Sequence, residues 1–169
     1  MQRGNNRPPC FLDDEDRQRH LQCLRPALLR FGCRLHACVL TSNHVHLLLT
    51  LDETGGVSRM MPTFARNHAG SFNGRHGRGG ALWEGRFKAC LVDSGRNFPS
   101  CSRCIELNPV RARMVAQPGA YPWSSHGANA QGRRHSLLAP HREFLGVGTD
   151  PAHRARRSSE SDGSGSDPP

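Results

Sequence analysis

The sequence lacks the features that mark membrane-spanning and secreted proteins. No apolar run approaches the ~20 residues that a transmembrane helix needs, and the start shows no apolar segment typical of a secretory leader. The seven cysteines are odd in number and scattered along the chain, which indicates reduced thiols rather than a disulfide framework. Together these absences favour a protein of the cytosol.

Two residue types are nearly missing. Tyrosine occurs once, at Tyr121, and lysine occurs once, at Lys88, so almost every basic residue is an arginine. Lys+Arg number 23 against 14 Asp+Glu, which gives a formal net charge of +9. A charge of this sign favours a polyanionic partner, and nucleic acid is the first candidate. The alternative is a basic surface without a partner.

The length of 169 residues suits one domain with a real core. We expect this domain to span residues 1–147. From Thr149 onward the sequence is polar and ends in Ser, Gly, Asp and Pro, a composition that cannot bury enough apolar surface to order itself. We therefore expect a disordered polar tail over residues 148–169.

Apolar periodicity predicts helices and strands in alternation along the domain. Acidic residues over 13–16 complement the dipole at a helix start, and Gly32 suits the end of that helix. In the strand that follows, Leu35, Ala37 and Val39 are expected on one face. The predicted elements are helices over 13–31, 57–73, 97–106 and 110–115, and strands over 34–40, 44–51 and 82–92.

Two histidines stand at the start of the strand over 44–51. Side chains alternate between the faces of a strand, so His44 and His46 point one way, toward solvent, while Val45 and Leu47 point into a core. Two imidazoles on one face form half of a divalent-metal site. The alternative is a solvated strand edge, since a motif is a hypothesis until its context agrees.

Four stretches, in order along the chain, carry a resemblance to a known family. They are NHVHLLL over 43–49, LWEGRFK over 82–88, CIELNPVRA over 104–112 and YPWSS over 121–125. In these stretches the chain resembles the REP-associated tyrosine transposases, a branch of the HUH single-strand transposases. The similarity runs from about Arg3 to Leu145.

The resemblance implies an α+β fold: a ferredoxin-like antiparallel sheet with helices on one face and the HUH motif on a central strand. It also implies a first strand leading into Arg3, and the chain starts too late to contain that strand. We therefore expect a gap beside the His-bearing strand, with unpaired backbone groups, and either a true start upstream or a damaged copy. The implied location is the bacterial cytoplasm, at the nucleoid.

The resemblance further implies binding and cleavage of single-stranded or hairpin DNA, by a monomer or a homodimer. His44 and His46 would bind Mg²⁺ or Mn²⁺, with Asn108 as third ligand, and the metal would polarise the scissile phosphate. In such enzymes a tyrosine one helical turn before that ligand attacks and becomes linked to the 5′ phosphate. Asn108 equally suits a helix N-cap, because Pro109 follows it.

Cys104 occupies the position of that tyrosine, which leaves three interpretations. Cys104 could act as a thiolate, although its side chain is much shorter; Tyr121 could swing in; or the protein binds DNA and metal without cutting. We prefer the third, because Pro26 and Pro62 fall inside predicted helices and indicate relaxed constraint on the fold. Cys101 and Cys104 form a CxxC motif, which indicates a different functional class, a zinc-binding or redox protein. No second cysteine pair at zinc-site spacing accompanies it.

The last predicted strand is the expected DNA contact. Trp83 and Phe87 offer stacking surfaces beside Arg86 and Lys88, a combination that suits single-stranded nucleic acid. Arg111 is expected to face phosphate. The alternative is that Trp83 and Phe87 simply pack on the core.

Overall fold

An antiparallel sheet of three strands, in the order β1-β3-β2, lies at the centre of the structure. The computed structural model describes residues 1–5, 8–93 and 97–141, and the predicted boundary at 147 and the tail over 148–169 lie outside them. The elements in chain order are β1 (Gln2–Arg3), α1 (Asp14–Arg30), β2 (Cys33–Leu40), β3 (His44–Leu51), α2 (Gly56–Arg75), α3 (Phe98–Glu106), α4 (Asn108–Arg111), a 3-10 turn (Pro118–Ala120) and α5 (His126–Asn129). The predicted α+β antiparallel fold is confirmed, with the His-bearing strand β3 in the middle of the sheet. Helices cover both faces of the sheet rather than the one face expected, because α1 and α2 pack on one face and α3 packs on the other.

A first strand lies beside the start of β3, where we expected a gap. Gln2 pairs with Val45 and Arg3 pairs with His44, both antiparallel. The strand is only two residues long, too short to give an alternating pattern in the sequence. Its pairs with β3 are limited to His44 and Val45, so among the described residues the expected gap is closed only at the start of β3.

A bulge in β2 decides which residues face each side of the sheet. The register between β2 and β3 shifts between Leu35 and Ala37, so these two residues, predicted on one face, lie on opposite faces. Leu35 packs with the cluster under α1 and α2, whereas Ala37 and Val39 pack with Phe98 on the α3 side. A bulge inserts one unpaired residue, which inverts the alternation beyond it.

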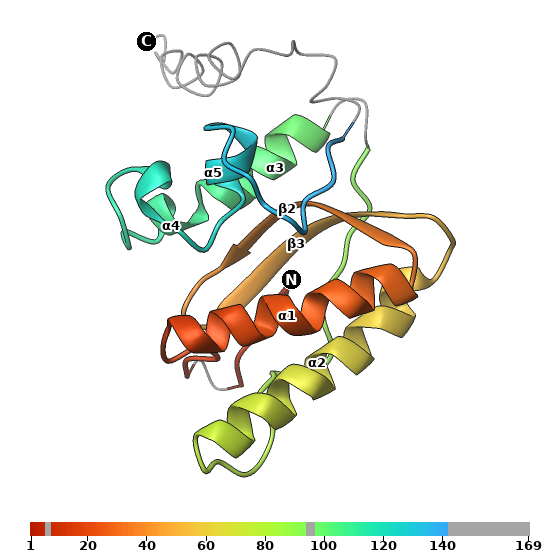
Figure 1. The fold of residues 1–169 in the computed structure, drawn as a ribbon, viewed down its shortest axis with the longest axis vertical. Helices are drawn as coiled ribbons and strands as arrows, with labels where there is room; N and C mark the ends of the chain where they lie inside the picture. The colour runs from red at the N-terminus through yellow and green to blue at the C-terminus, as the bar shows by residue number, and fades with distance from the viewer. Residues whose placement is uncertain (6–7, 94–96, 142–169) are drawn as a thin grey trace, which may run out of the picture.

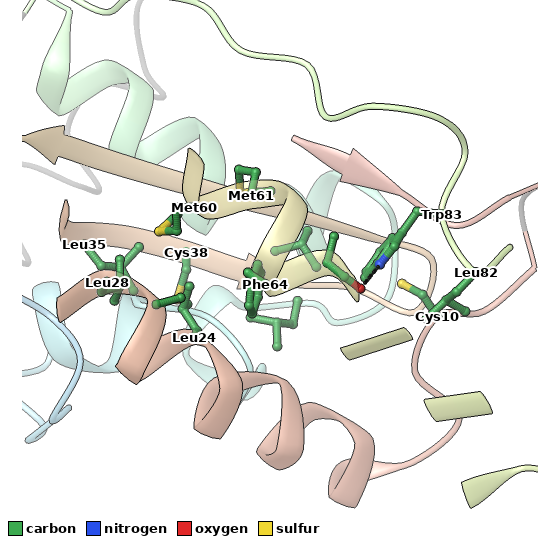
Figure 2. Packing of buried hydrophobic residues seen from close by; sticks show 14 of the residues in the cluster. Cys10, Leu24, Leu28, Leu35, Cys38, Met60, Met61, Phe64, Leu82 and Trp83 are labelled. Carbon is green, nitrogen blue, oxygen red and sulfur yellow. Dashed lines mark hydrogen bonds between the residues drawn. The ribbon is translucent and has the colours of Figure 1, made fainter. Parts of the chain in front are cut away.

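Helices α1 and α2 lie side by side against one face of the sheet, and α3, α4 and α5 are grouped away from them (Figure 1). Figure 2 shows the apolar layer between the helix pair and the sheet, built from residues such as Leu24, Leu28, Met60 and Phe64. Both helices run through their internal prolines, Pro26 and Pro62. Within the described ranges, no helix combines the length and the apolar character needed to cross a membrane.

The segment over 82–92 runs along β1 but does not form the predicted strand. One isolated antiparallel bridge joins Gly4 to Trp83, the Glu84 N–H donates to the Arg3 carbonyl at 2.9 Å, and the Lys88 N–H donates to the Met1 carbonyl at 2.8 Å. Gly85, at a φ of +63°, turns the backbone between these contacts. The segment therefore follows the short β1 without a continuous ladder.

Candidate metal centre and DNA-binding edge

His44 and His46 lie on the face of β3 that α3 covers, with their ring centroids 5.1 Å apart and edge to face. Both are half-buried rather than directed into open solvent as we expected. Burial lowers the pKa of His46 to about 4, and the neighbouring His44, the N-terminal amine and Arg3 add to that shift. The pKa of His44 is also lowered, mainly by burial. Both rings are therefore neutral near pH 7, the form that binds a metal ion.

Hydrogen bonds fix the tautomer of His44. The Thr41 hydroxyl donates its proton to the His44 carbonyl at 3.0 Å, so Thr41 Oγ1 can only accept from His44 Nδ1, 2.8 Å away. The Asn43 Oδ1 atom, also 2.8 Å from Nδ1, is an acceptor as well. Nδ1 therefore carries the proton, and Nε2 presents a free lone pair, which is how second-shell partners prepare a histidine ligand.

Asn108 presents its amide oxygen to that lone pair. Its Oδ1 lies 3.2 Å from His44 Nε2, and the N-cap of α4 is Leu107, which makes Asn108 the first residue of the helix and not its cap. The side chain is thus committed to His44 and not to capping the helix. Two acceptor atoms that face each other repel unless a cation lies between them or the amide turns over, so His44, His46 and Asn108 fit an Mg²⁺ or Mn²⁺ site of imidazole and amide-oxygen donors.

Cys104 lies one helical turn before Asn108, on α3, and is exposed. Arg111 reaches back to it, and the guanidinium Nη1 donates to Cys104 Sγ at 3.0 Å. Within the described residues, no three His, Cys, Asp or Glu side chains gather to hold a metal ion. Cys104 therefore does not join the two histidines as a ligand, and the CxxC has no third group of this kind to complete a zinc site.

Tyr121 is buried on the α3 side of the sheet, only 8% exposed. Its hydroxyl donates to the Leu40 carbonyl at 2.7 Å, and burial raises its pKa. Attack on a phosphate by Tyr121 would require loss of this hydrogen bond and of its core contacts.

Ser125 of the YPWSS stretch helps to hold the buried carboxylate of Glu106, a residue that the sequence indicated to be structural or phosphate-facing rather than catalytic. Glu106 Oε1 accepts from the Ser125 hydroxyl and from the Asn129 amide, each at 2.7 Å. Ser125 Oγ in turn accepts from the Cys38 N–H of β2 at 3.1 Å. This network joins α3, which carries Cys104, to the sheet that carries the histidines.

The predicted DNA contacts divide into buried and exposed residues. Trp83 is 8% exposed, and its Nε1–H donates to the Ala65 carbonyl of α2 at 3.0 Å (Figure 2). Its ring packs in the core, so the prediction that it offers a stacking surface is wrong. Arg86, Lys88 and Arg111 are exposed.

Arg3 is a candidate that the sequence did not reveal. It is exposed, and its register opposite His44 places both side chains on the same face of the sheet. Only recognition of β1 could have identified it, and two residues give no periodicity to recognise.

Comparisons with known proteins show the family and the fold. The family profile described as "Transposase IS200 like" matches residues 1–106. A solved structure described as "Structure of the REP associates tyrosine transposase bound to a REP hairpin" has the same fold, with a TM-score of 0.64 and 20% identity over 83% of this chain and 82% of that chain. No curated protein matches the sequence.

Proposed function

We propose that this chain, which belongs to the family of IS200-like transposases, binds single-stranded or hairpin DNA at the β1–β3 edge and does not cut it through a tyrosine. His44, His46 and Asn108 would hold Mg²⁺ or Mn²⁺. The observation that carries this proposal is the 3.2 Å approach of His44 Nε2 to Asn108 Oδ1, on a ring whose Nδ1 contacts Thr41 and Asn43. The hairpin DNA bound by the structurally similar transposase supports the choice of ligand.

The bound metal would polarise a phosphate oxygen and neutralise charge that develops on it. The protein supplies the rest of the site. Thr41 and Asn43 hold His44 in the ligand tautomer, and the low pKa of His46, about 4, keeps that ring unprotonated.

Three exposed cations favour contact with a DNA backbone. Arg3 lies opposite His44 in the sheet, Lys88 is tied to the Met1 carbonyl through its own N–H, and Arg111 lies on α4 beside Cys104. Each exposed guanidinium or ammonium that contacts a phosphate releases counterions, so binding would weaken steeply with salt.

Two features argue against tyrosine-mediated cleavage by this chain. The single tyrosine is buried and hydrogen-bonded to Leu40, and the helix position expected for the nucleophile holds Cys104, whose sulfur accepts from Arg111. A cysteine side chain is shorter than a tyrosine side chain, and a misplacement of about 1 Å can cost about 100-fold in rate.

The test is a titration of labelled hairpin DNA with a single-stranded flank, at several salt concentrations. We expect binding at low salt and a linear fall of log affinity with log salt. A blunt, fully paired duplex of the same composition is the control and should bind more weakly. Folded protein that shows no affinity for the hairpin at low salt would contradict the proposed function.

A further inference from the structure

A cavity of about 730 Å³ lies between α2 and the segment over 80–89. Its walls are largely apolar and include Met61, Ala65 and Ala69 of α2 and the ring of Phe87. None of its lining residues is acidic. Gln2 also lines the cavity and pairs with Val45, so it faces the α1–α2 side of the sheet, opposite to the side of the two histidines.

Gln2 gives this cavity a buried hydrogen-bond acceptor that has no donor among the described residues. The residue is 6% exposed, and among the described residues its Oε1 atom has no hydrogen-bond donor. A buried acceptor without a donor is uncommon in folded proteins.

Two cations stand at the mouth of the cavity. Arg66 projects from α2 and Arg86 from the segment opposite, and both are exposed lining residues. Apolar walls, an acceptor inside and guanidinium groups outside match the three parts of a nucleotide: the faces of the base, its amino edge and its phosphate.

We propose that this cavity takes up one unpaired base of the bound DNA, a base that carries an exocyclic amino group. The proposal rests on the proposed function, because it assigns a second contact for the same DNA. The amino group donates to Gln2 Oε1, the base lies against Met61, Ala69 and Phe87, and the adjoining phosphates contact Arg66 and Arg86. An amide side chain pairs well with the amino edge of adenine.

The short strand β1 connects this cavity to the metal centre. Consecutive residues of a strand point to opposite faces, so Arg3 lies beside His44 while Gln2 lines the cavity. The segment over 82–92 covers the outer edge of β1, so a DNA strand would pass around this segment to meet the histidine face on one side and place a base into the cavity on the other.

The experiment is an abasic scan of the single-stranded flank of the hairpin. Each nucleotide is replaced in turn by an abasic analogue, and affinity is measured at one low salt concentration. For the unmodified chain we expect one flank position at which loss of the base weakens binding about fivefold or more, the effect of losing one stacked base. At that position adenine or cytosine should bind more tightly than thymine.

Variants test whether the cavity causes this effect. Ala69→Phe fills the cavity and should remove the penalty of the abasic substitution, because base-bearing and abasic DNA would then bind equally. Asn67→Phe adds the same ring at an exposed position of the same helix outside the cavity, and should keep the penalty. Gln2→Leu should keep part of the penalty and lose the preference for an amino-bearing base. Ala89→Trp, from the opposite wall, replaces Ala69→Phe if that variant fails to fold.

The outcomes separate the two proposals. If the unmodified chain binds hairpin DNA but shows no sensitive flank position, or if the penalty persists in both filled variants, the cavity is only a gap in packing and this inference is wrong while the proposed function stands. If the folded chain binds no hairpin DNA at low salt, the proposed function fails, and this inference fails with it.

Discussion

His44 and Asn108 approach each other from β3 and α4, 64 residues apart in sequence, with Nε2 and Oδ1 separated by 3.2 Å. The contact depends on two packing arrangements. Thr41 and Asn43 turn the imidazole so that its unprotonated nitrogen faces α4. Glu106, at the end of α3, anchors the helix just before Asn108 through Ser125 and Asn129.

Asn108 should therefore control metal affinity. We expect Asn108→Ala to weaken Mn²⁺ binding at least about tenfold, the lower range seen when even an outer-shell partner is removed. Asn108→Asp should strengthen it, because a carboxylate adds charge to the same donor position. Isothermal calorimetry with Mn²⁺ measures both, and Asn67→Ala, at an exposed site on α2, is the matched control. Equal affinities for Asn108→Ala and the unmodified chain would remove Asn108 from the ligand set.

His44 and His46 should each be required for Mn²⁺ binding. His44→Ala and His46→Ala should weaken Mn²⁺ binding, because one imidazole and one amide oxygen leave too few donors. Since α3 covers this face, each change also removes packing, so we expect a lowered melting temperature as well. His135→Ala, which removes a half-buried histidine from another loop, should leave Mn²⁺ binding unchanged. Unaltered Mn²⁺ binding in the double variant would identify the pair as a plain strand edge.

Buried histidines should make the fold sensitive to acid. Burial, with a smaller effect of His68, holds the pKa of His20 well below 6.5, and the pKa values of His46, His68 and His36 are lowered mainly by burial as well. Between the ordinary value of 6.5 and about 4, the pKa of His46, the unfolded chain binds more protons than the folded one. The free energy of unfolding must then fall as pH falls through this window.

His20 offers a direct check of that slope. Both of its ring nitrogens are without hydrogen-bond partners among the described residues, and it packs between Phe11, Phe64 and His68. His20→Leu should flatten the loss of stability from pH 7 to pH 5, because the buried group no longer takes up a proton on unfolding. Urea unfolding at pH 8, where histidine is neutral in both states, serves as the internal control. A slope unchanged by the substitution would show that other groups dominate the acid response.

The sequence predicted well what depends on local periodicity. Alternation along β3 placed His44 and His46 on one face and Val45 and Leu47 on the other, as the structure has them. Prediction from sequence periodicity failed where one extra residue changes the strand register, and where a short segment is held by residues far away in the sequence. The bulge after Leu35 inverts part of β2, and β1 depends on distant partners, β3 on one side and the segment over 82–92 on the other.

The location of Trp83 could not be predicted from the sequence alone. Aromatic residues between cations suit both a stacking surface and a core with charged neighbours. The choice depended on α2, whose Ala65 carbonyl accepts the indole N–H, and no spacing within LWEGRFK carries that information. The cavity beside it was invisible for the same reason, since its walls come from α2, β1 and the segment over 80–89.

The last prediction concerns the nucleophile. The unmodified chain should form no covalent adduct with the 5′ phosphate of single-stranded DNA. Tyr121 is buried and hydrogen-bonded to Leu40, and Cys104 Sγ accepts a hydrogen bond from Arg111. A phosphate ester also suits a hard oxygen nucleophile better than a soft sulfur. Cys104→Tyr should be the substitution most able to restore cleavage, since it extends a phenol from an exposed position one turn before Asn108.

The assay is a denaturing gel with labelled hairpin DNA and Mn²⁺, in which a shifted protein–DNA band reports the phosphotyrosine bond. Cys101→Tyr places the same side chain one turn earlier on α3 and should give no band, and neither should Cys104→Tyr combined with His46→Ala. A band from the unmodified chain that Cys104→Ser abolishes would make Cys104 the nucleophile and the binding-only proposal wrong. A band that only Tyr121→Phe abolishes would instead mean that Tyr121 leaves its buried site to attack, and that α3 does not carry the nucleophile.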